Sequence, residues 1–208
     1  MALPGNKKKV LVTLLDQGWI RPELAVVASI LQRDERYSVE VRSMNHKPSE
    51  RNRNLAVQSM LEGGFDYLLT IDHDVVPKAN PLDLIELDLD VVCFAVPQWN
   101  MTDPKFPIYF VAMDAVEGGY REHKTQEGLQ EIDAAGSGCL LIARRVLEQV
   151  KAPFVREWND DGIDTCGLDF AFSKKAKSLG FKVWCHYDFV ADHFKELSLL
   201  DILKFKLA

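Results

Sequence analysis

Two acidic residues, Asp72 and Asp74, flank His73 directly after the apolar run 67–71. In open α/β sheets, ligands gather at the carboxyl ends of the strands. Residues two apart at a strand end point the same way, so both carboxylates can face one ligand. Two close negative charges repel each other unless a cation lies between them, and hard divalent cations prefer oxygen ligands. The triplet predicts metal-assisted chemistry, although a pair of solvated turn acids has the same pattern.

Three further segments have residue types that suit a phosphate or sugar ligand. Arg51, Arg53 and Asn54 lie at the start of a predicted helix, where backbone N–H groups, the helix dipole and guanidinium groups favour anions. Small residues at 134–138 allow the backbone to approach a ligand closely. The ring of Trp158 suits the apolar C–H face of a sugar. A solvated basic helix face, a tight turn and a packed tryptophan are the structural alternatives.

A strand that ends in Asp-x-Asp about a third of the way along an α/β chain resembles the metal-binding motif of GT-A glycosyltransferases. Other segments are similar to bacterial and phage (family 2-like) members of that superfamily. They are Glu50–Asn54 before the strand, the segment 133–142, and the segment from Gly167-Leu168-Asp169 to Asp192-His193. The likeness covers nearly the whole chain, from the first predicted strand to His193.

This resemblance implies a metal-dependent glycosyltransferase that uses a nucleotide-sugar donor, either a UDP-sugar or a GDP-sugar. The divalent cation, Mn²⁺ or Mg²⁺, would bridge the donor's diphosphate and act as a Lewis acid. The implied metal ligands are Asp72, Asp74 and His193, with Asp74 the more direct ligand of the two acids. The implied nucleotide contacts come from Thr13, Arg51, Arg53, Asn54 and Asp72.

The resemblance also implies an acceptor pocket and a general base. The acceptor-site residues would be Gly136, Ser137, Gly138 and Trp158. Asp169 corresponds to the residue that takes the acceptor proton in inverting members, and a position near a helix N-terminus favours its charged form. Leu168 stands where relatives commonly carry Glu, which weakens the assignment of the base. The identity of the hydroxyl acceptor, and retention or inversion of the anomeric centre, stay open.

The elements that must position these residues follow an α/β pattern. Apolar, strand-like runs alternate with helical patterns, which predicts βαβ units and a mostly parallel central sheet flanked by helices. Strands are predicted at 9–15, 37–42, 67–71, 91–96 and 182–187. Helices are predicted at 22–32, from 48 to the glycines 63–64, after 81, and at 143–150, 168–179 and 197–207. The stretch 97–133 predicts a small antiparallel excursion with strands at 108–113 and 129–132.

We interpret residues 1–208 as a single Rossmann-like GT-A domain, with a nucleotide-binding half at 1–96 and an acceptor-binding half at 97–208. The net charge of −6 gives no overall basic field, so no dedicated nucleic-acid binding is expected. No apolar stretch is long enough to predict a transmembrane segment. Four cysteines without a CxxC pair favour a reduced, cytoplasmic setting.

Two other functions fit part of the pattern. In haloacid-dehalogenase-type phosphatases, an apolar strand precedes an Asp-x-Asp whose first aspartate attacks phosphorus, a role that Asp72 would take here. That family places the motif on its first strand, whereas two strand–helix units precede it in this chain. A non-catalytic nucleotide-sugar binding module is the third possibility, supported by Leu168. A dinucleotide-binding Rossmann domain is disfavoured because no G-x-G-x-x-G follows the first strand.

Overall fold

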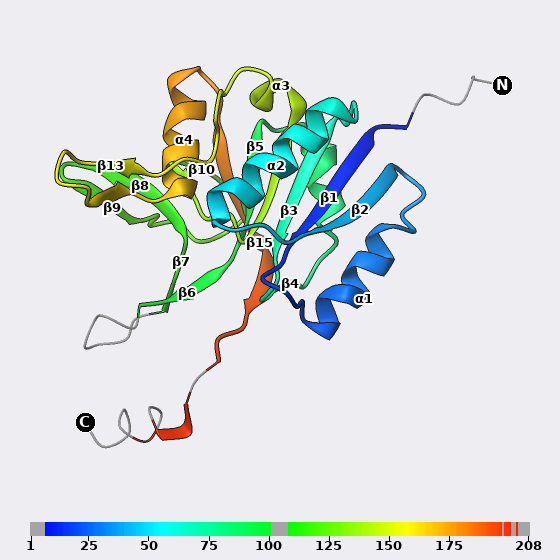
Figure 1. Ribbon diagram of the computed structural model, residues 1–208, viewed down its shortest axis with the longest axis horizontal. Helices are drawn as coiled ribbons and strands as arrows, with labels where there is room; N and C mark the ends of the chain where they lie inside the picture. Colours follow the sequence, from blue (N-terminus) through cyan, green and yellow to red (C-terminus); the bar gives the residue numbers. More distant parts are fainter. Residues whose placement is uncertain (1–6, 101–107, 197, 201–202, 204–208) are drawn as a thin grey trace.

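The computed structural model describes residues 7–100, 108–196, 198–200 and 203. Its centre is a twisted sheet (Figure 1). The candidate site lies at the carboxyl ends of two interior strands of this sheet. The strands of this sheet are β1 (Lys9–Leu15), β2 (Ser38–Met44), β3 (Tyr67–Asp72), β4 (Val75–Pro77), β5 (Val91–Ala95), β10 (Leu129–Ile132), β12 (Cys139–Ala143) and β15 (Val183–His193). Their order is β10-β15-β5-β12-β3-β1-β2, and β4 pairs with the far end of β15.

The sheet is mixed, with most of its strands running in one direction. β1 pairs in parallel with both β2 and β3, and β15 pairs in parallel with β5. β12 runs antiparallel to its neighbours β3 and β5, and β10 runs antiparallel to β15. The expected α/β sheet is confirmed in this coarser form. The reversed β12 separates the two parallel groups.

Helices cover both faces because alternate strand residues point to opposite sides. Val10 and Val12 pack with α1 (Pro22–Leu31) and the 3₁₀ helix η1 (Pro81–Leu87). Leu11 and Leu15 belong to the core of the other face, which is covered by α2 (Ser49–Glu62), α3 (Arg144–Leu147) and α4 (Leu168–Ser178). Figure 1 shows α1 and α2 on opposite sides of the sheet.

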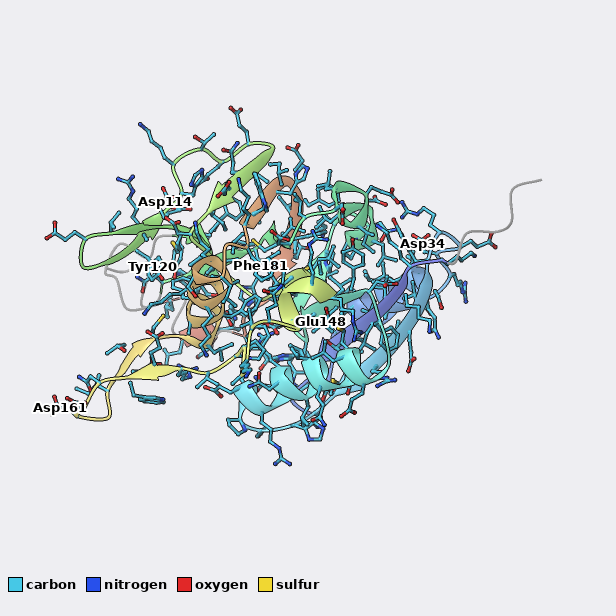
Figure 2. The ribbon with its side chains drawn as sticks, turned by 90° about the horizontal axis from the view of Figure 1, so that it is seen from above. Asp34, Asp114, Tyr120, Glu148, Asp161 and Phe181 are labelled. Atoms are coloured by element: carbon cyan, nitrogen blue, oxygen red, sulfur yellow. The ribbon has the colours of Figure 1, made fainter. Side chains whose placement is uncertain are left out.

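Short strands outside the main sheet form the antiparallel part of the fold. They are β6 (Pro97–Trp99) with β7 (Ile108–Phe110), β8 (Ala112–Val116) with β9 (Gly119–Glu122) and β11 (Ala134–Ala135), and β13 (Glu157–Trp158) with β14 (Asp164–Cys166). Figure 2 shows Asp161 at the outer end of the β13–β14 hairpin, away from the central sheet.

Three predicted elements differ from those observed. The strand at 129–132 was expected in the antiparallel excursion, but it pairs with β15 at the edge of the main sheet. The strand at 108–113 is divided between β7 and β8, which belong to different sheets. The helix at 143–150 is only the short α3, because residue 143 still belongs to the buried strand β12.

Most of the helix predicted at 197–207 lies outside the described residues. Among the residues that the structure describes, no helix combines the length and the apolarity needed to cross a membrane.

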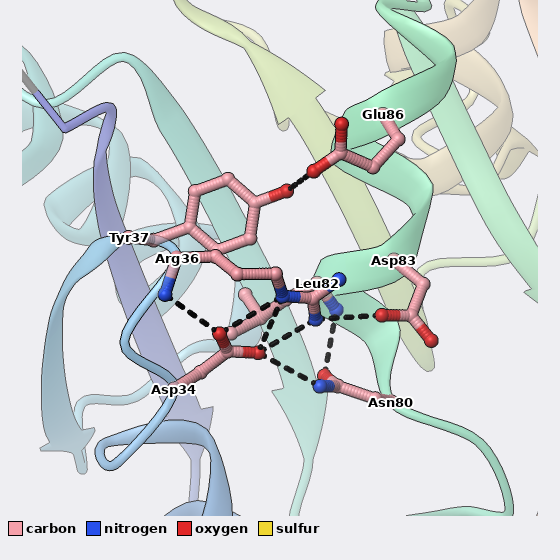
Figure 3. A network of polar contacts seen from close by, with 7 residues as sticks. All are labelled: Asp34, Arg36, Tyr37, Asn80, Leu82, Asp83 and Glu86. Atoms are coloured by element: carbon pink, nitrogen blue, oxygen red, sulfur yellow. Dashed lines mark hydrogen bonds and ion pairs between the residues drawn. The ribbon is translucent and has the colours of Figure 1, made fainter. Parts of the chain in front are cut away.

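A polar network fastens the loop before β2 to η1 (Figure 3). Asp34 accepts hydrogen bonds from the side chain of Arg36 and from Asn80, and Arg36 also contacts Asp83 at 2.6 Å. Tyr37 donates a hydrogen bond to Glu86. The hydrogen bonds from Arg36 hold the pKa of Asp34 well below its usual range. The network fixes η1, whose apolar side chains complete one face of the core.

Candidate functional site

A polar cleft of about 800 Å³ lies at the carboxyl ends of β1 and β3, and we call it the main cleft. The start of α2, strand β6 and the end of β15 contribute its other walls. Its polar lining side chains include Asp16, Asn52, Arg53, Asp72, Asp74, Gln98, His193 and Lys195. The position agrees with the general placement of ligand sites in open α/β sheets.

Arg53 and Asp72 form a buried ion pair at the back of the main cleft. Nη2 of Arg53 lies 2.8 Å from Oδ1 and 3.0 Å from Oδ2 of Asp72. The Arg53 side chain is only 6% exposed, whereas that of Asp72 is 27% exposed. Nη1 of Arg53 also donates to the carbonyl oxygen of Ser137 at 3.5 Å. Arg53 was predicted to contact the nucleotide; its two terminal nitrogens contact these protein partners, while its Nε has no hydrogen-bond partner among the described residues.

The pKa values of Asp72 and Arg53 are both raised in this pair. Burial raises the pKa of Asp72, and the nearby carboxylates of Asp169 and Asp74 raise it further, although Arg53 acts in the opposite direction. Burial alone would lower the pKa of Arg53, but the negative charges of Asp72 and Asp169 outweigh burial and raise it. Arg53 is therefore a fixed positive charge that lies between these two carboxylates.

Asp74 and His193 lie side by side on the opposite wall. Nε2 of His193 is 3.3 Å from Oδ2 of Asp74, and Nδ1 lies 2.7 Å from the carbonyl oxygen of Pro97. A carbonyl oxygen only accepts, so Nδ1 carries a proton and Nε2 faces Asp74. Burial opposes ionisation of Asp74, but the hydrogen bond from His193 and the charge of Lys195 hold its pKa far below the usual range.

Of the three predicted metal ligands, Asp72 does not form a group with Asp74 and His193. Within the described residues, no group of three or more His, Cys, Asp and Glu side chains is placed closely enough to hold a metal ion. Asp74 and His193 are adjacent, while both oxygens of Asp72 are held by Arg53. A cation at Asp74 and His193 would take its remaining ligands from water and from phosphate oxygens, as Mg²⁺ commonly does.

A smaller side cleft of about 360 Å³ adjoins the main cleft, with Ser49 and Arg53 lining both. Asp169, in the first turn of α4, lines the side cleft, and its Oδ2 accepts a hydrogen bond from the backbone N–H of Ser137 at 3.2 Å. Among the described residues, Oδ1 of Asp169 has no hydrogen-bond partner. Leu168, the first residue of α4, is buried in the core.

The small-residue segment is packed against the strands that carry the site. A Cβ atom at Gly136 would come within 2.8 Å of the side chain of Val111, and one at Gly138 would lie 3.3 Å from Val75 and Val96. The carbonyl oxygen of Gly138 accepts the backbone N–H of Asp72 at 2.9 Å. These glycines permit close packing next to Asp72, and their predicted approach to a ligand stays a prediction.

Seven predicted residues do not line either cleft, and three of them are the acceptor-segment residues Gly136, Ser137 and Gly138. Thr13 is fully buried, because β1 continues for two residues beyond it before reaching the cleft. Arg51 is exposed on α2. Asn54 exchanges two hydrogen bonds with the backbone of Phe154. Trp158 is 59% exposed on the β13–β14 hairpin.

Asp16 and Lys195 are two of the cleft residues that were missed in the sequence. Asp16 directly follows β1, just as Asp72 ends β3, so the same strand-end rule could have found it. It accepts hydrogen bonds from the backbone N–H of Gly18 and from the hydroxyl of Ser43, and so orders the turn beside the cleft. Lys195, two residues after His193, lies 3.1 Å from Oδ2 of Asp74. A lysine beyond the last strand has no sequence signal that separates it from surface lysines.

No protein-family model matches this sequence, and no curated protein matches it. Solved structures do match. The structure of A197 from STIV superposes with a TM-score of 0.60 at 19% identity, over 90% of this chain and 86% of that one.

Two transferase structures also match. A structure of GalNAc-T7 with UDP, GalNAc and Mn²⁺ gives a TM-score of 0.52 at 13% identity, over 94% of this chain but only 45% of that protein. The inositol-1-phosphate CTP transferase from T. maritima gives a TM-score of 0.50 at 11% identity, over 97% and 96% of the two chains. At these identities the likenesses show a shared mixed α/β fold.

Proposed function

We propose that this protein is a metal-dependent glycosyltransferase that moves a sugar from a nucleoside-diphosphate sugar to an acceptor hydroxyl. The observation that carries the proposal is the adjacency of two distinct clefts. One contains Asp74 and His193 at the strand ends, and the other contains Asp169. The likeness to GalNAc-T7, a protein crystallised with UDP, GalNAc and Mn²⁺, supports the same assignment at the level of fold.

The donor set fits a divalent cation. Asp74 supplies a carboxylate, and the Pro97 carbonyl keeps a proton on Nδ1 of His193, so Nε2 could bind a cation once it gives up the proton that it donates to Asp74. Orientation of a metal-binding histidine through its other ring nitrogen is the usual arrangement. Lys195 already contacts Asp74, so a divalent cation would have to displace this ammonium or share the carboxylate with it. When bound, the metal would neutralise the charge of the leaving diphosphate.

The chain's own residues would then perform three tasks. Arg53 holds Asp72 at the back of the main cleft, where that carboxylate can contact the metal or the ribose. Asp169, which lines the side cleft, orients an acceptor hydroxyl there and accepts its proton. Ser137 fixes Oδ2 of Asp169 through its backbone N–H. The proposal assigns residues 1–96 mainly to the donor and 97–208 mainly to the acceptor.

Nucleotidyl transfer is a second candidate, favoured by the likeness to the CTP transferase. The two reactions release different products. Sugar transfer releases a nucleoside diphosphate, whereas nucleotidyl transfer from a nucleoside triphosphate releases pyrophosphate. The phosphatase alternative is less well supported, because Arg53 holds both oxygens of Asp72, the residue that would attack phosphorus.

The test is a screen of nucleotide sugars for Mn²⁺-dependent release of UDP or GDP. In parallel, release of pyrophosphate from CTP is measured as the test of nucleotidyl transfer. Asp74→Asn should lose metal-dependent nucleotide binding, while Asp188→Asn, which changes an exposed carboxylate on β15, should retain it. Asp169→Asn should keep donor binding and lose transfer. If Asp74→Asn binds nucleotide with unchanged metal dependence, the proposed function is wrong.

A further inference from the structure

Lys195 occupies the position beside Asp74 that a cation would need. Its Nζ lies 3.1 Å from Oδ2 of Asp74, the same oxygen that His193 approaches at 3.3 Å. The Asp74 side chain is largely buried, so this ion pair is less screened by solvent than one between exposed side chains. An ammonium group and a divalent cation cannot both contact that oxygen from the cleft side without strong mutual repulsion.

The backbone holds Lys195 in place. The N–H of Phe194 donates to the carbonyl oxygen of Asp74 at 2.9 Å, and His193 pairs with Val75 in the β4–β15 ladder. The guanidinium carbon of Arg21 stacks 3.7 Å from the centre of the Phe194 ring. The two residues before Lys195 are thus anchored to Asp74 and Val75.

The charges of the main cleft are balanced without a metal. Three carboxylates line it, and three cationic side chains lie on the same lining. The carboxylates are Asp16, Asp72 and Asp74, and the cations are Lys47, Arg53 and Lys195. A divalent cation added alone would leave the cleft with an excess of positive charge. A diphosphate, with its own negative charges, removes that excess.

We propose that Lys195 competes with the divalent cation for Asp74, and that this competition makes metal and diphosphate bind cooperatively. The inference rests on the proposed function, because it assigns Lys195 a role toward the same cation. Metal alone must displace the Lys195 ammonium from its only carboxylate partner among the described residues. When a diphosphate is present, the displaced ammonium has a new anion on the same cleft wall, so displacement becomes favourable.

The experiment measures Mn²⁺ affinity of the wild type and of Lys195→Met, with and without inorganic pyrophosphate. Isothermal titration or the electron paramagnetic resonance of free Mn²⁺ gives the dissociation constant, and the Mn²⁺–pyrophosphate association is measured separately in protein-free buffer. The wild type should bind Mn²⁺ about tenfold more tightly with pyrophosphate than without it. Lys195→Met should bind Mn²⁺ alone several-fold more tightly than the wild type, and its gain from pyrophosphate should shrink.

Lys78→Met is the matched control. Lys78 pairs with Asp192, one residue before His193, so the variant removes the same charge near the same strand but outside the cleft lining. Its Mn²⁺ affinity and its pyrophosphate response should match those of the wild type.

Two results would overturn the inference in distinguishable ways. If the wild type binds Mn²⁺ at Asp74, as Asp74→Asn shows, and Lys195→Met binds it no more tightly, then Lys195 does not compete and the proposed function stands. If neither protein binds Mn²⁺ with or without pyrophosphate, the proposed function fails together with the inference. Lys195 is about one-third exposed, so its variant is expected to fold, and circular dichroism checks this.

Discussion

Replacement of Arg53 by methionine should lower the free energy of unfolding by roughly 2–4 kcal/mol. Methionine preserves much of the apolar stem but removes the two hydrogen bonds to Asp72, at 2.8 and 3.0 Å. Removal of one partner from a buried ion pair costs about 3–5 kcal/mol, because the other charge is left without compensation. Asp72 is 27% exposed, so water recovers part of this cost and the expected loss falls to about 2–4 kcal/mol.

The loss should be recovered in part by a second substitution. Asp72→Asn removes the stranded charge, so Arg53→Met/Asp72→Asn should be more stable than the sum of the single losses predicts. Contacting residues in one network show coupling energies of about 0.5–3 kcal/mol, and this pair should lie toward the upper end. Arg51→Met is the control, since Arg51 is an exposed arginine two residues earlier on α2, and its effect should stay within about 0.5 kcal/mol.

Urea unfolding followed by far-ultraviolet circular dichroism measures all four proteins of this cycle and the control. The slopes with denaturant should agree, so that the midpoints report stability alone. A loss below about 1 kcal/mol in Arg53→Met, or single effects that simply add, would refute the idea that Arg53 neutralises Asp72. Asp72 would then have to be stabilised mainly by solvent.

Three further predictions concern other parts of the molecule. Asp34→Asn should cost about 1–3 kcal/mol near neutral pH in urea unfolding. The low folded-state pKa of Asp34 means that this difference is present above its unfolded value of about 3.9 and shrinks as the pH falls below it. Gly136→Ala should lower the unfolding free energy by about 1–3 kcal/mol, because the new Cβ meets Val111, and the thermal midpoint measures this. Trp158→Ala should leave stability within about 0.5 kcal/mol and raise the KM for the acceptor in a transfer assay.

Each of these predictions has a result that contradicts it. A stability gap between wild type and Asp34→Asn that is as large at pH 2 as at neutral pH would show that ionisation of Asp34 is not what the network stabilises. Gly136→Ala with wild-type stability would mean that the backbone near Val111 shifts freely. An unchanged acceptor KM in Trp158→Ala would remove this tryptophan from the acceptor site.

The strands next to the site were predictable because each is a nearly continuous apolar run that ends in polar residues. Asp72 and Asp74 were found by this rule, and the cleft lies where it places them. Strand direction is not encoded in the same way. β12 is as apolar as β3 and fully buried, so its antiparallel orientation could not be read from composition. The partner of 129–132 is equally hidden, since it lies more than fifty residues later in β15.

The side chains of the site were less predictable than its strands. Arg53 carries a charge in a basic, polar helix start, which indicates a solvent-facing residue, yet it is nearly as buried as the core. Its burial depends on Asp72, which only the fold brings to it. Thr13 was expected to hold the nucleotide from the end of the first strand, but it is fully buried. The strand extends past it, and its hydroxyl lies 3.5 Å from the carbonyl oxygen of Leu69.

The long strand β15 has a consequence for how the protein is made. It lies between β5 and β10 in the sheet, so Val183 pairs with Val91 and Cys185 with Cys93, far earlier in the chain. During translation, the edges of β5 and β10 that pair with β15 therefore stay unpaired until β15 leaves the ribosome. Exposed edges favour aggregation, and such distant pairings fold slowly. Because His193 and Lys195 follow on the same strand and its extension, the cleft is completed in the same late step that closes the sheet.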